Sequence, residues 1–189
     1  MDMDPPKNLG LIFIIFLLFS ACSQEESTTS VSEQMDGIEL NLSLEKQEYS
    51  LDEEVVATVI ITNHNDESVD FFVPIPIDFK EGIAGVSVER QNELMFQLLS
   101  PKTDINISNI VGRSYYDFVY IQLEPKEIIE QAFLWNQDLI NQETQETIQG
   151  EAGEYLISTF ILLDELDEQL EYFEPNNQLI SKLTFSVNN

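Results

Sequence analysis

The sequence predicts an all-β protein, an antiparallel sandwich of about seven to nine strands packed as two sheets. Three observations indicate this fold class. Apolar residues fall on every second position in Ile38–Glu45 and again in Leu179–Val187, which is the spacing of half-buried strands. Val55–Thr62 is β-branched at almost every position, which also favours a strand. Turn-forming residues separate the extended segments, and few stretches have the period of a helix.

The first elements follow in chain order from these signals. Ile38–Glu45 is predicted to be a strand with one buried face, and Lys46–Glu54 a connection. Val55–Thr62 is predicted to be a strand covered on both faces, because apolar residues occupy both sides of it. Asn63–Asp66 is a turn, from which we expect a hairpin to a strand over Val69–Val73.

The middle of the chain is less regular. Residues 74–85 contain two prolines that cannot donate to a ladder, so we expect an edge or loop, with Ile83 exposed unless something covers it. Val86–Val88 and Leu94–Leu99 are expected to be strands around a turn. Residues 100–116 form an irregular insertion longer than most connections, which indicates either a binding loop or an unrecognised short strand.

The C-terminal part returns to strand signals. Phe118–Leu123 and Ile128–Trp135 are predicted to be strands around the turn Glu124–Glu127. Asn136–Gly150 is rich in Gln and Glu, so that either a short helix or a polar loop is allowed. A long strand over Leu156–Leu163 follows, and after an acidic excursion the alternating segment described above closes the sandwich.

The N-terminal residues predict a targeting signal. Leu9–Phe19 is apolar, but as a helix it covers only about 16 Å, roughly half the hydrocarbon core of a bilayer. A short polar head precedes it and small residues follow, ending at Cys22, the only cysteine, which is the pattern of an export signal. Three outcomes are open for such a leader: lipid attachment, cleavage to a soluble form, and retention as an anchor.

This leader resembles the lipobox of bacterial lipoproteins. The resemblance implies that residues 1–21 are a helical signal peptide that is removed. It also implies that the sulfur of Cys22, and the amino group that cleavage exposes on it, are acylated. Several acyl chains would hold the protein firmly at a membrane, facing outside the cytoplasm on the outer membrane or cell surface. Ser23 stands where the Asp of the inner-membrane retention signal would be. Residues 22–36 read as an acidic flexible linker, and 37–189 as one domain.

Charge and cysteine usage exclude several functions. The chain has 35 acidic against 8 basic residues and a net charge of −27, which excludes non-specific attraction to nucleic acid or anionic lipid headgroups. A single cysteine permits no intrachain disulfide and no thiolate zinc cluster. The acidity is consistent with a solvated surface that keeps an exported domain soluble, and specific binding of cations or basic partners is the alternative.

Several separate motifs together resemble a known domain family. They are the Asn63 strand end with Ser68–Phe72, the turn Leu123–Glu127, Trp135, and Gly153-Glu154-Tyr155. The domain resembles the immunoglobulin-like modules of bacterial surface proteins and, more narrowly, the BsuPI-type proteinase-inhibitor domain. The resemblance implies an immunoglobulin-like sandwich with a tyrosine corner, and inhibition of an exported proteinase as one function. Within the turn, Lys126 replaces the glycine that is usual in that family.

Catalytic motifs are missing from the sequence. His64 is the sole histidine and lies among turn residues, and no nucleophile elbow, zinc-protease helix or phosphate loop occurs. We therefore expect no enzyme activity and no cofactor apart from the lipid on Cys22. An unrecognised carboxylate-based hydrolase is the alternative, because abundant acids make many chance pairs.

Two weaker candidate sites complete the sequence analysis. Arg113, Tyr115 and Tyr116 bring residue types of interface hot spots onto the irregular insertion, although packing of that insertion explains them equally well. Acidic side chains after the long strand offer oxygen ligands for calcium without the spacing of a tight site, and a solvated loop or short helix is the alternative. These acids are Asp164, Glu165, Asp167 and Glu168.

The expected function is therefore that of a lipid-anchored binding module of the cell envelope, with an extracytoplasmic protein or proteinase as partner. A structural envelope component without a discrete ligand is the alternative.

Overall fold

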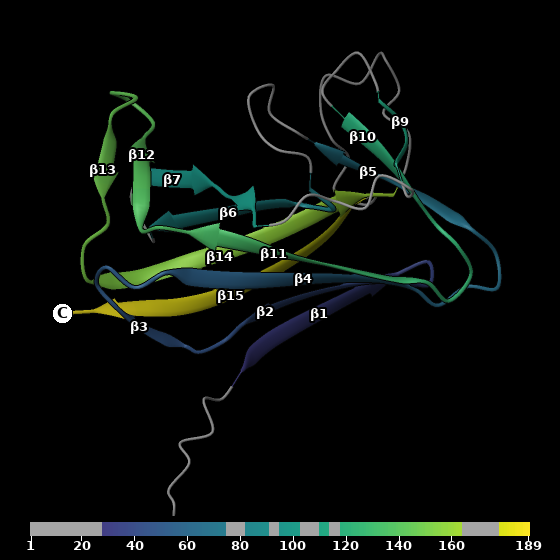
Figure 1. Ribbon diagram of the computed structural model, residues 1–189, viewed down its shortest axis with the longest axis horizontal. Helices are drawn as coiled ribbons and strands as arrows, with labels where there is room; N and C mark the ends of the chain where they lie inside the picture. Colours follow the sequence, from purple (N-terminus) through teal and green to yellow (C-terminus); the bar gives the residue numbers. More distant parts are fainter. Residues whose placement is uncertain (1–27, 75–81, 91–94, 103–109, 114–117, 164–177) are drawn as a thin grey trace, which may run out of the picture.

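The computed structural model describes residues 28–74, 82–90, 95–102, 110–113, 118–163 and 178–189. Every regular element in these ranges is a strand, and the strands form one five-stranded and one ten-stranded sheet (Figure 1). The all-β prediction is confirmed, with more strands than the seven to nine expected. The signal helix lies outside the described residues. No helix long and apolar enough to cross a membrane occurs in the described ranges.

The five-stranded sheet has the order β1-β2-β4-β11-β8, and each neighbouring pair is antiparallel. Asp36 and Gly37 join β1 to β2 with φ values of 50° and 79°. Two positive φ angles are what a two-residue hairpin turn requires, and Asp-Gly is a favoured pair for it. The strands are β1 (Thr29–Met35), β2 (Ile38–Leu44), β4 (Val55–Asn63), β8 (Ser100–Pro101) and β11 (Ile128–Trp135).

The ten-stranded sheet is organised around β14 (Gly153–Leu162). One edge of β14 pairs along its whole length with β15 (Gln178–Asn188), and the other edge pairs first with β6 and then with β5. The sheet therefore divides into two branches, β6-β7-β12-β13 and β5-β10-β9. The remaining strands are β3 (Glu48–Ser50), β5 (Val69–Pro74), β6 (Gly85–Arg90), β7 (Met95–Leu98), β9 (Ile110–Arg113), β10 (Phe118–Leu123), β12 (Asp138–Asn141) and β13 (Thr147–Gln149).

An aromatic cluster joins the two sheets. Trp135 of β11 packs on Tyr155 of β14 and Phe185 of β15, with ring centroids 4.9 and 5.7 Å apart, and Tyr49 of β3 meets Phe185 edge to face at 5.7 Å. All four side chains are almost fully buried. Aromatic side chains of this size bury about 150–250 Å² each, so the cluster contributes a large share of the apolar burial.

Tyr155 also forms the tyrosine corner that the sequence motif predicted. Its hydroxyl donates a hydrogen bond of 2.6 Å to the carbonyl oxygen of Glu151, four residues upstream. Gly150 makes room for this corner, because a Cβ there would lie 2.8 Å from the Gln137 carbonyl oxygen and 2.9 Å from the tyrosine hydroxyl. The corner fixes the chain where it enters β14.

Two predictions about β4 are wrong. Its buried positions alternate with half-buried ones, so only one of its two faces is fully buried. The expected hairpin from β4 to β5 is absent, because β5 belongs to the other sheet. Both edges of β4 are already occupied by the longer strands β2 and β11, so the turn after Asn63 crosses between sheets.

Two of the segments with weak signals differ from expectation. The predicted linker 22–36 contains β1, and residues 136–150 form the hairpin of β12 and β13 where a helix or polar loop was expected. In the insertion 100–116, the described residues include the short strands β8 and β9, which agrees with the second of the two predicted alternatives. Ile83 is covered at 2% exposure, and its N–H donates to the buried Gln131 side chain at 2.7 Å.

Candidate functional site

Most of the site residues predicted from the sequence lie outside the described ranges. These are Cys22, Tyr115 and Tyr116, and the candidate calcium ligands Asp164, Glu165, Asp167 and Glu168. Arg113 is placed as the last residue of β9, opposite Val119 of β10.

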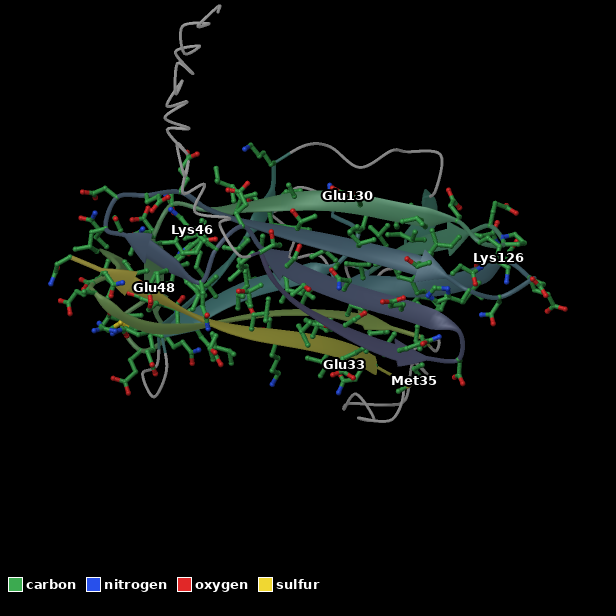
Figure 2. The ribbon with its side chains drawn as sticks, turned by 90° about the horizontal axis from the view of Figure 1, so that it is seen from below. Glu33, Met35, Lys46, Glu48, Lys126 and Glu130 are labelled. Atoms are coloured by element: carbon green, nitrogen blue, oxygen red, sulfur yellow. The ribbon has the colours of Figure 1, made fainter. Side chains whose placement is uncertain are left out.

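The sole histidine belongs to a surface network that we call the histidine cluster, formed by Ser32, Glu39 and His64. Glu39 on β2 lies in the middle: its Oε2 is 2.7 Å from His64 Nε2, and its Oε1 accepts a hydrogen bond from the Ser32 hydroxyl on β1. Lys126 holds the turn that carries His64: its Nζ donates a hydrogen bond to the His64 carbonyl oxygen at 2.6 Å and forms an ion pair with Asp66 at 2.8 Å. Figure 2 shows Lys126 at this end of the sandwich, opposite the end that carries Lys46 and Glu48.

The histidine cluster has the residue types of a hydrolase triad in an order that does not support its chemistry. Nucleophilic catalysis needs the imidazole between hydroxyl and carboxylate, so that the ring takes the hydroxyl proton. Here the carboxylate lies between the other two groups, and Ser32 donates to Glu39. The arrangement ties β1, β2 and the turn after β4 together, and it places no imidazole beside the serine hydroxyl.

Hydrogen bonding lowers the pKa of Glu39 below its usual value of 4.5, first through Ser32 and then through His64. A carboxyl with a lowered folded-state pKa adds stability above its unfolded pKa, and this is lost as pH falls through the folded-state value. We therefore expect Glu39→Gln to be less stable than wild type at pH 7 and the difference to shrink below about pH 4. Urea unfolding of both proteins at several pH values measures this. A difference that stays constant down to pH 3 would contradict the assignment.

The opposite end of the molecule contains a polar cleft of about 530 Å³, which we call the end cleft. It is lined by Leu51, Asp52, Gln149, Gly150, Glu151, Ala152 and Asn189. The two acidic side chains are already engaged: Asp52 accepts a hydrogen bond from Gln149 at 2.7 Å, and Glu151 lies 3.3 Å from Arg90. Across the described residues, no group of three or more metal-binding side chains comes together.

Gln137, which the sequence did not single out, holds the turn that contributes Leu51 and Asp52 to the end cleft. The amide nitrogen of this side chain donates to the carbonyl oxygens of Ser50 and Glu53, both at 2.7 Å, and its oxygen accepts from the Asp52 N–H at 3.2 Å. Gln137 is 1% exposed and has a φ of 65°. A buried glutamine in a polar, Gln-rich stretch carries no sequence signal, because the same residue type in a loop is usually solvated.

Comparison with known proteins assigns no family. No protein-family model matches the chain, and no curated protein matches it at a significant level. Solved structures resemble it only loosely. A β-glucosidase from Listeria innocua has 17% identity and a TM-score of 0.43 over 85% of this chain, and the chain spans 17% of that enzyme. The CARDB domain of the PF1109 protein from Pyrococcus furiosus has 16% identity and a TM-score of 0.36 over 86% of this chain and 94% of the domain. At these TM-scores the likeness supports no functional argument.

Proposed function

We propose that this chain is a lipid-anchored protein of the cell envelope whose immunoglobulin-like domain binds another extracytoplasmic protein. The observation that carries the proposal is the tyrosine corner of Tyr155, packed against the buried Trp135 between two sheets. In immunoglobulin-like sandwiches such a corner and a buried tryptophan fix a rigid scaffold that presents its loops and edges to partners.

The turn Glu124–Glu127 supports the resemblance to the BsuPI-type domain. The Glu127 N–H donates to the Glu124 carbonyl oxygen at 3.0 Å, Pro125 holds the second position, and Lys126 has a φ of 63° at the third. This is the pattern of a type II turn, whose third residue favours glycine. Lys126 thus adopts the left-handed backbone conformation at the position where the family has its glycine. Inhibition of an exported proteinase is the finer form of the proposal.

The start of β1 makes the proposed anchor a short one. Thr29 lies seven residues after Cys22, and seven residues span at most about 25 Å when fully extended. The expected linker of 22–36 would have given a longer reach. An acylated Cys22 would therefore keep the domain close to the membrane surface, within range of proteins at that surface.

A binding role also agrees with how the described polar groups are used. The histidine cluster, the end cleft and the buried side chains Asn63, Gln131 and Gln137 are each engaged in contacts that hold turns and strands in place. None of these groups presents a nucleophile beside a base. In the proposed function, these contacts make the described sandwich a scaffold for binding.

Replacing Cys22 by serine tests the anchor. Cells grown with an alkyne-tagged palmitate should label the wild-type protein, and mass spectrometry should show its mature form beginning at an acylated Cys22. The Cys22→Ser variant should take up no label and should not be cut after residue 21, whereas Ser23→Ala should behave as wild type. An unmodified thiol at Cys22 in the membrane-derived protein would refute the lipid anchor.

The finer form has its own test. The protein released from membranes should slow at least one of a panel of secreted serine proteinases without being digested. If it slows none of them, inhibition is excluded and the binding role has to be tested by other partners.

A further inference from the structure

Among the described residues, the outer edge of β1 has no strand partner, and β1 has few of the features that usually protect an edge. β1 is the terminal strand of the five-stranded sheet, and all its residues from Thr29 to Met35 pair with β2 in one unbroken register. None of the other described strands pairs with its second edge. Proline, lysine and β-bulges commonly block pairing at such edges, and β1 has none of them.

The hairpin geometry determines which backbone groups face outward. Asp36 and Gly37 form a two-residue turn, so Met35 and Ile38 are the hydrogen-bonded pair that closes it. Hydrogen-bonded pairs then recur at every second residue of β1. The N–H and C=O groups of Ser30, Ser32 and Gln34 therefore point to the open edge.

The inward side of the same edge has an unusual composition. Val31, Glu33 and Met35 share a face with the buried residues Leu42, Leu40 and Ile38 that they oppose on β2. Val31 and Met35 are only half-buried against the core, and Glu33 between them is exposed. Figure 2 shows Glu33 and Met35 where β1 lies over β15. None of the ion pairs formed among the described residues includes Glu33.

Charge decides between the occupants that this edge could take. Pairing with a second copy about the centre of β1 would place two Glu33 side chains on one face as diagonal neighbours about 7 Å apart. It would also join two chains that each carry a net charge of −27. A positively charged extended segment would instead be attracted to this edge. It would place a cation beside Glu33 and cover the apolar side chains of Val31 and Met35.

We propose that the open edge of β1 binds an extended segment of a partner protein by antiparallel strand addition, with a basic residue opposite Glu33 and apolar residues opposite Val31 and Met35. The inference rests on the proposed binding function and names the kind of partner that it would take. Main-chain hydrogen bonds to Ser30, Ser32 and Gln34 would supply affinity, and the three inward side chains would supply specificity. The position opposite Glu33 is a non-hydrogen-bonded pair, in which side chains approach most closely.

Titration with short peptides tests the preferred sequence. The probe is the capped peptide Thr-Val-Thr-Lys-Thr-Leu-Thr, added to the full chain and followed by calorimetry or by NMR shifts of the β1 amides. The same peptide with Glu in place of Lys should bind with an affinity at least about five-fold lower. With the Glu33→Lys variant the preference should reverse. Equal affinities for the two peptides, or a preference that Glu33→Lys leaves unchanged, would overturn the role of Glu33.

A second pair of variants tests strand addition itself. Ser32→Pro removes an N–H that points to the open edge and leaves the hydrogen bonds to β2 intact, so it should weaken the lysine peptide about ten-fold. Ser32→Ala keeps the N–H but also loses the hydrogen bond to Glu39, which makes it the matched control, and it should bind as wild type. Equal binding by the two variants would overturn strand addition. If Ser32→Pro loses the peptide but still recovers the same envelope proteins as wild type, the proposed function stands and the partner uses another surface.

Discussion

Replacing Asn63 by alanine is expected to lower the free energy of unfolding by about 3 kcal/mol. Asn63 ends β4 and is fully buried. Its amide nitrogen donates to the carbonyl oxygens of Glu67, Leu123 and Glu124 at 2.9, 3.2 and 3.0 Å, and its oxygen accepts from the Asn65 N–H at 2.9 Å. Alanine would remove all four hydrogen bonds, of which the one to Leu123 is buried and the others are partly buried, and each buried group left without a partner costs about 1–3 kcal/mol. Equilibrium urea unfolding, followed by the fluorescence of the single tryptophan, measures the change.

Two further variants separate this role from a general effect of the turn. Asn65→Ala removes a single exposed hydrogen bond from the Asn65 amide to the Asp36 carbonyl oxygen, so it should cost less than about 1 kcal/mol. Asn63→Asp keeps the acceptor for Asn65 but aims a carboxylate at three carbonyl oxygens, so at pH 7 it should destabilise at least as much as alanine. If Asn63→Ala costs no more than Asn65→Ala, Asn63 does not hold the two turns together.

Strict alternation of burial makes β2 the clearest of the strands that the sequence predicted. In β2 the residues Ile38, Leu40, Leu42 and Leu44 are all at most 1% exposed, and the apolar spacing alone identifies such a strand. β1 escaped prediction because only Val31 and Met35 of its inward positions are apolar and Glu33 interrupts them. An edge strand needs less apolar cover than a central one, so a polar segment can still be part of the sheet.

The assignment of strands to sheets could not be predicted from local patterns. β4 and β5 follow each other across a short turn, which normally indicates a hairpin. The crossing depends on Asn63, which bonds the backbone of its own turn and also that of the turn after β10, about sixty residues later. An asparagine at a strand end looks the same in a sequence whether it caps a hairpin or joins two sheets.

The contacts of the candidate site were equally hidden. Ser32, Glu39 and His64 come from two strands and a turn, and only the register of β1 on β2 and of β2 on β4 places them side by side. The tyrosine corner was predictable because its partner lies four residues away in the chain. Sequence reasoning therefore identified the local motif and missed the contacts that depend on register.

Replacing Trp135 by alanine should have the largest effect on stability, a loss of about 4 kcal/mol. The indole is 1% exposed, packs on Tyr155 and Phe185, and donates from Nε1 to the Asp138 carbonyl oxygen at 2.7 Å. Its removal would leave a cavity between the two sheets beside the tyrosine corner. Urea unfolding followed by circular dichroism measures this change, because the fluorescent residue is lost.

Controls on the same strand separate volume from hydrogen bonding. Trp135→Phe keeps an aromatic ring against Tyr155 but loses the indole N–H. Loss of this hydrogen bond should lower the free energy of unfolding by about 1–2 kcal/mol, in addition to a small loss from poorer packing. Leu134→Ala changes the neighbouring side chain, which is half-buried on the outer face of β11, and should cost less than Trp135→Ala. The expected order of loss is therefore Trp135→Ala, then Trp135→Phe. A Trp135→Ala protein as stable as Leu134→Ala would mean that other contacts hold the two sheets together. The packing of Trp135 on the tyrosine corner would then not be what makes the scaffold rigid.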